Sequence, residues 1–142
     1  MSKSTISCLG ILFLVGLTSH QAASAEWVVV GADTQSRVMV DTDSIASEMI
    51  LNDTYTKAWL RQDYVAPQII GRKRFRSVMT LEYFKCAERR SANLQATYYA
   101  EPVGNRMVFH TEGSYLGAVV FEDVKPGSIG EAIFRATCLK RR

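Results

Sequence analysis

The centre of this sequence is a strand-like stretch, Phe75-Arg76-Ser77-Val78-Met79-Thr80-Leu81-Glu82-Tyr83-Phe84-Lys85-Cys86. In an extended strand, alternate side chains point to opposite faces. One face then carries Phe75, Met79, Leu81 and Tyr83, and the other carries Val78, Phe84 and Cys86. Both sets are apolar, whereas a sheet covered on one side alternates between polar and apolar residues. We therefore expect a central strand with a covering layer on each face.

The end of the chain predicts a helix that forms one of these layers. Ser128 and Glu131 have the spacing of a capping box, which marks a helix start. One helical face then carries Ile129, Ala132, Ile133 and Ala136. Cys138 lies at the end of this helix, and a bond to Cys86 would hold the helix on the face that carries Phe84.

The beginning of the chain has the pattern of a cleavable signal peptide. Lys3 gives a positive start, residues 8–17 form an apolar run, and Ala23-Ser24-Ala25 is a small-residue cleavage site before Glu26. A buried core helix would lack this ordered pattern. The apolar run is also too short to span a bilayer. We expect residues 1–25 to be removed, leaving residues 26–142 as one exported domain with no transmembrane segment.

The sequence contains three cysteines, of which Cys8 lies in the predicted signal peptide. Two cysteines in an exported domain favour a disulfide between Cys86 and Cys138 over a reactive or metal-binding thiol pair. Closing a loop of this length removes about 4 kcal/mol of unfolded-state freedom. The bond would therefore be a large part of the domain's stability.

Other segments predict a sheet around the central strand. Strand-like runs cover residues 26–31, 37–41, 54–65, 91–99 and 106–110. The first two are expected to pair as a hairpin, and the last two to pair around the turn formers of residues 101–105. Asp43 is predicted to cap one helical turn. Pro67 and Gly71 are expected to close the strand over 54–65.

The strongest charge feature is a run of four cations, Arg72, Lys73, Arg74 and Arg76. Such a run is either a solvated loop or a site for polyanions such as heparin-like glycans. A second cluster is expected where the disulfide brings residues 140–142 near Arg89 and Arg90. The formal net charge of +3 falls to +2 without Lys3, so no strong field favours nucleic acid.

Catalytic and metal-binding patterns are weak. His110 is the one histidine after the predicted cleavage site, and no local signature surrounds it, so we predict no enzyme activity. Two thiols are too few for a zinc site. Asp41-Thr42-Asp43 lacks the glycine and distant glutamate of a calcium loop. We predict no metal and no cofactor.

The aromatic residues are expected to form core and cross-strand pairs rather than a binding platform. They are Trp27, Tyr55, Trp59, Tyr64, Tyr83, Tyr98 and Tyr99. If one sheet face lacked a covering layer, several of them would be exposed, and self-association would cover them. A homodimer is therefore a prediction.

Seven segments together resemble the surface-adhesin protein E family of Gram-negative bacteria. They are Glu26-Trp27-Val28-Val29, Val38-Met39-Val40-Asp41 with Ser44-Ile45, Asp63-Tyr64, Arg74-Phe75-Arg76-Ser77, Glu82-Tyr83-Phe84-Lys85-Cys86, Tyr98-Tyr99, and Val124-Lys125-Pro126-Gly127-Ser128 with Cys138. The resemblance implies a curved antiparallel sheet, a C-terminal helix tethered by the Cys86–Cys138 bond, and a tendency to dimerise. With the segments above, the expected fold is α+β, with about six strands and the helix on one face.

The resemblance also implies an adhesin that binds host matrix or plasma proteins. We therefore expect a non-enzymatic binding domain that engages host extracellular-matrix or cell-envelope components, including polyanionic glycans. Thr18-Ser19-His20 stands where a lipoprotein has its cysteine, so we expect a periplasmic or released domain, with the cell surface as a third location. The alternative is a periplasmic structural or stress-related protein whose partner is another envelope protein.

Overall fold

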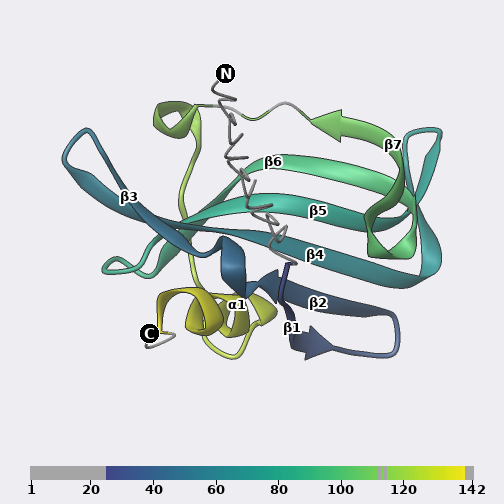
Figure 1. The fold of residues 1–142 in the computed structure, drawn as a ribbon, viewed down its shortest axis with the longest axis horizontal. Coiled ribbons are helices and arrows are strands. Elements are labelled where there is room, and N and C mark those ends of the chain that lie inside the picture. The colour runs from purple at the N-terminus through teal and green to yellow at the C-terminus, as the bar shows by residue number, and fades with distance from the viewer. Residues whose placement is uncertain (1–24, 112, 114, 140–142) are drawn as a thin grey trace, which may run out of the picture.

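The computed structural model describes residues 25–111, 113 and 115–139, so the predicted signal peptide lies almost wholly outside the described residues. These residues form one curved antiparallel sheet of eight strands and a C-terminal helix that lies against one face (Figure 1). The predicted α+β fold is confirmed, with more strands than the six or so expected. No helix in the described part of the chain has the length and apolar character needed to cross a bilayer.

The sheet follows the chain in a nearly sequential order. Its strands are β1 (Trp27–Ala32), β2 (Ser36–Asp41), β3 (Ala46–Ile50), β4 (Asp53–Ile70), β5 (Lys73–Lys85), β6 (Arg90–Glu101), β7 (Asn105–Thr111) and β8 (Glu122–Asp123). The main order is β1-β2-β4-β5-β6-β7, while β3 also pairs with β4 and β8 with β6. Three 3₁₀ turns, η1 (Thr42–Ser44), η2 (Pro102–Gly104) and η3 (Leu116–Ala118), and the helix α1 (Ile129–Cys138) complete the fold.

The segment after β2 differs from the prediction. The cap of the short helical turn is Asp41, not Asp43, because the Asp41 carboxylate accepts a hydrogen bond from the Asp43 backbone N–H at 3.1 Å. The chain then forms β3, which was not predicted. Leu51 and Asn52 both have positive φ, 48° and 69°, which is the geometry of a tight hairpin turn joining β3 to β4.

Strand β4 is longer than predicted because Pro67 does not end it. The register with β5 shifts between Asp63 and Gln68, and Pro67 lies inside this bulge. Proline lacks a backbone N–H and is tolerated where the ladder is interrupted. The strand instead ends at the turn with Gly71, whose φ of 59° suits glycine.

The helix covers one face of the sheet, called here the helix face. Phe134 of α1 packs on Phe84 of β5 with ring centroids 6.4 Å apart, and both are buried. The same cluster contains Val40 and Leu60 from the neighbouring strands. The predicted position of the helix on the side of Phe84 is confirmed.

The opposite face is covered around Tyr83, next to Phe84 along β5, by the segment that contains η3. Tyr55 and Tyr83 lie edge to face with centroids 6.3 Å apart, and Phe121 covers Tyr55 at 5.8 Å. All three are buried. A covering group on each face of the central strand is thus confirmed.

Phe75 departs from the predicted alternation. It packs in one cluster with Val78, which was expected on the other face, and its ring lies 5.0 Å from Tyr98 and 5.8 Å from Tyr64. The bulge in β4 lies next to Phe75 and breaks the two-residue period.

Candidate functional site

The predicted disulfide is present and joins two elements far apart in the sequence. Cys86 lies just after β5 and Cys138 ends α1, with their Cα atoms 5.7 Å apart and a sequence separation of 52. Both side chains pack against the helix-face cluster. The bond therefore holds α1 on the sheet.

The predicted basic run forms the end of the β4–β5 hairpin. We call residues 69–74 the hairpin tip. Gly71 and Arg72 make the turn, and Arg72, Lys73 and Arg74 are all exposed. Among the described residues, none of the ion pairs includes any of these three cations. Their charge is therefore not neutralised by a neighbouring carboxylate.

The hairpin tip extends past both neighbouring strands. Pairing between β2 and β4 ends at Tyr64, and pairing between β5 and β6 ends at Ser77, so the tip lies beyond both partners. The hairpin curves upward beside β7 (Figure 1). The Lys73 ammonium lies 4.8 Å from the ring centroid of Phe109 on β7, which fixes this approach.

Arg76 has a different role from the other three cations. Its guanidinium donates a 2.8 Å hydrogen bond to the backbone carbonyl of Val65, across the bulge of β4. Arg76 thus braces the stem of the hairpin, and three of the four predicted cations remain at the tip.

The second predicted basic cluster is largely paired where it can be described. Arg89 forms a 3.0 Å ion pair with Glu131 of α1, and Arg90 lies 3.3 Å from Asp123. Residues 140–142, the other predicted members, lie outside the described residues. The described half therefore offers less free positive charge than the hairpin tip.

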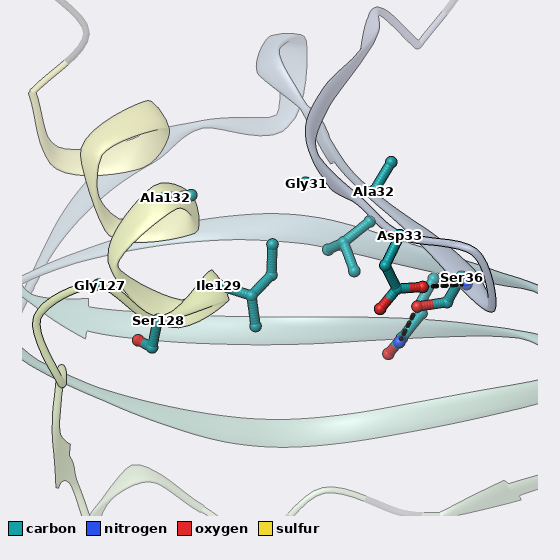
Figure 2. A pocket seen from close by; sticks show the side chains of 10 residues that line it. Gly31, Ala32, Asp33, Ser36, Gly127, Ser128, Ile129 and Ala132 are labelled. Carbon is teal, nitrogen blue, oxygen red and sulfur yellow. Dashed lines mark hydrogen bonds between the residues drawn. The ribbon is translucent and has the colours of Figure 1, made fainter.

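A groove of mixed polar and apolar lining, which was not predicted, lies on the helix face next to the start of α1. Figure 2 shows Ile129 pointing from the first turn of the helix toward Gly31, with Asp33 and Ser36 on the far side. The groove has a volume of about 380 Å³. Asp33 accepts 2.7 Å hydrogen bonds from the backbone N–H groups of Gln35 and Ser36, which lower the pKa of its carboxyl.

Glu82 lines the continuation of this groove under α1. It lies with Thr80 of β5, Asn93 of β6 and Ile133 of the helix in a hollow of about 230 Å³. Burial raises the pKa of Glu82, and a hydrogen bond with Ser91 opposes the rise. The hollow offers hydrogen-bonding groups to a small polar molecule. The sequence signal was present: Thr80 and Glu82 are polar positions between the apolar Val78 and Phe84 of the helix face.

Comparison with known families gives a match over nearly all of the described chain. The family model of surface-adhesin protein E matches residues 27–139. The chain belongs to this family. Searches of curated proteins and of solved structures find no match.

The family match spans the sheet from β1 onward, the helix α1, both bonded cysteines and the hairpin tip. Within this surface-adhesin protein E domain, His110 is exposed on β7 with its Nδ1 2.8 Å from the Thr97 hydroxyl. The described residues gather no group of three or more His, Cys, Asp or Glu side chains placed to hold a metal ion. Asp41 is occupied as the cap of η1.

Proposed function

We propose that this protein is an exported, non-enzymatic, adhesin-like domain that binds host extracellular-matrix or cell-envelope components through its hairpin tip. Residues 1–25 act as the signal peptide and residues 26–142 form the working domain. Membership of the surface-adhesin protein E family supports the class of function. The observation that carries the choice of surface is the set of exposed, unneutralised cations Arg72, Lys73 and Arg74.

The partner of such a tip is a polyanion, either a sulfated glycan or an acidic segment of a matrix or plasma protein. Guanidinium groups pair with sulfate and carboxylate through forked hydrogen bonds, and lysine adds a point charge. Because the pairings of β2 with β4 and of β5 with β6 end before the tip, Arg72, Lys73 and Arg74 stay exposed to an extended partner. The domain needs no other chemistry for this role.

Heparin affinity chromatography tests the tip directly. We expect the exported protein to be retained at about 0.15 M NaCl and the variant Arg72→Ser/Lys73→Ser/Arg74→Ser to flow through, because three exposed cations without a carboxylate partner are lost. The matched control is Arg37→Ser/Lys125→Ser/Arg135→Ser, which removes the same charge from exposed positions elsewhere. Equal elution of the two triple variants would show that net charge, not the tip, governs binding.

The alternative function is a periplasmic structural or stress-related protein with an envelope-protein partner and no host contact. The groove that contains Asp33 and the adjoining hollow that contains Glu82 favour it, since a groove beside a helix suits a segment of another protein. Location separates the two functions, because only a surface or released protein meets a host ligand.

A further inference from the structure

Two exposed isoleucines lie among the cations of the hairpin tip. Ile69 is directly opposite Arg74 in the β4–β5 ladder, and Ile70 is opposite Lys73. Ile69 is 67 % exposed and Ile70 is 43 % exposed. Each apolar side chain thus has a cation as its cross-strand neighbour and water over much of its surface. Neither belongs to a core cluster of the described residues.

Further apolar surface lies close to the tip. Val65, at the bulge of β4, is 66 % exposed, and the guanidinium of Arg76 holds its carbonyl in place. Met107, on β7, is 64 % exposed, and this strand meets the tip through the contact between Lys73 and Phe109. Val65 and Met107 therefore add exposed apolar surface on the two strands that border the tip, while Ile69 and Ile70 lie beside its cations.

We propose that the hairpin tip docks on an anionic phospholipid surface. Ile69 with Arg74 and Ile70 with Lys73 lie on opposite faces of the hairpin. Each face would then place one cation on the lipid phosphates and one isoleucine at the boundary between headgroups and acyl chains, with Arg72 in the turn between them. Clustered cations are attracted to anionic leaflets, and aliphatic groups beside them gain by leaving water for that boundary. A sulfated glycan meets the charges but offers no apolar phase for the isoleucines. The inference rests on the proposed function, since it keeps the hairpin tip as the binding surface, and it goes beyond that function by adding an anionic lipid surface to the envelope components that the tip binds.

The test is co-sedimentation of the exported protein, purified after expression of the full chain, with vesicles of phosphatidylcholine containing about one-third phosphatidylglycerol. We expect the protein to bind these anionic vesicles, and to bind vesicles of pure phosphatidylcholine at least about tenfold more weakly. The variant Ile69→Ser/Ile70→Ser should lose at least about tenfold in vesicle binding while its retention on heparin is unchanged. The control variant Met49→Ser/Leu51→Ser removes two exposed apolar side chains from the β3–β4 hairpin, and it should bind vesicles like the wild type.

Three outcomes would overturn the lipid proposal. They are no binding of the wild type to the anionic vesicles, equal vesicle binding by the Ile69→Ser/Ile70→Ser variant, and loss of heparin retention by that variant. If the wild type does not bind the anionic vesicles but is retained on heparin, the proposed function stands without the lipid partner. If the wild type binds neither vesicles nor heparin, the proposed function is contradicted as well. A second probe is Ile69→Trp, whose fluorescence should be quenched by brominated acyl chains. Unquenched emission in the vesicle-bound protein would place residue 69 outside the bilayer and contradict insertion.

Discussion

At the scale of single residues, Glu82 shows how the fold handles a carboxyl beneath its helix. The side chain shares its hollow with Thr80, Asn93 and Ile133. Burial raises its pKa because the charged form loses hydration, and the hydrogen bond with Ser91 recovers part of that loss. A carboxyl with a raised pKa stabilises the fold below its unfolded pKa, and this contribution is lost as pH rises through the folded pKa.

Replacing Glu82 with glutamine should therefore increase the free energy of unfolding at neutral pH. The amide keeps the shape and carries no charge to bury. The gain should shrink as the pH approaches about 4, where the wild-type carboxyl is protonated in the unfolded state too. Urea unfolding at both pH values measures this, with Glu122→Gln on exposed β8 as the control. A gain that is equal at both pH values would contradict the assigned cause.

Single residues were predicted well where their chemistry is unusual and poorly where it depends on neighbours. Cys86 and Cys138 are identifiable because an exported domain leaves a cysteine pair few alternatives. The cations at the tip are identifiable because they are adjacent in sequence. The burial of Glu82 and the hydrogen bond of Arg76 depend on residues that are distant in sequence, so only the structure shows them.

At the scale of elements, the helix α1 is held by its cap, its apolar face and one covalent bond. Ser128 accepts a hydrogen bond from the Glu131 backbone N–H, and Glu131 in turn accepts one from Gly127. Phe134 then fills the space above Phe84. The periodicity of the sequence predicted this helix because its capping box and apolar face agree with each other.

Removing the disulfide should cost about 4 kcal/mol of unfolding free energy, because the unfolded chain regains the freedom of a long loop. The variant to measure is Cys86→Ser/Cys138→Ser, by urea denaturation against the oxidised wild type. Dithiothreitol should lower wild-type stability toward that of the variant and leave the variant unchanged. A loss below about 1 kcal/mol would show that α1 is held by packing alone.

The strands were predicted less evenly than the helix. The hairpins of β1 with β2 and of β6 with β7 follow from apolar runs bounded by turn formers, and both are confirmed. β3 was missed because its turn uses Leu51 and Asn52 rather than glycine. The strand predicted over residues 54–65 is shorter than β4 because proline usually ends a strand. Only the pairing with β5 shows that Pro67 lies in a bulge.

At the scale of the whole molecule, the open edge of the sheet bears on the predicted homodimer. β1 lies at one edge of the sheet and carries no charged residue. Its Val28 is 41 % exposed and its Val29 is 50 % exposed. An uncharged edge strand can pair with another copy. We expect sedimentation equilibrium at micromolar concentration to show a dimer that Val29→Lys weakens, whereas a wild type that is monomeric throughout would contradict it.

The proposed adhesin function depends on where the protein works, and trypsin treatment of intact cells tests this location most directly. The hairpin tip offers three adjacent cleavage sites, after Arg72, Lys73 and Arg74, outside the loop closed by Cys86 and Cys138. We predict that the protein is found on the cell surface or in the medium, and that trypsin splits it at the tip into two fragments that separate on a denaturing gel run without reducing agent. Recovery only in the osmotic-shock fraction, uncut on intact cells, would contradict the adhesin function and favour the periplasmic alternative.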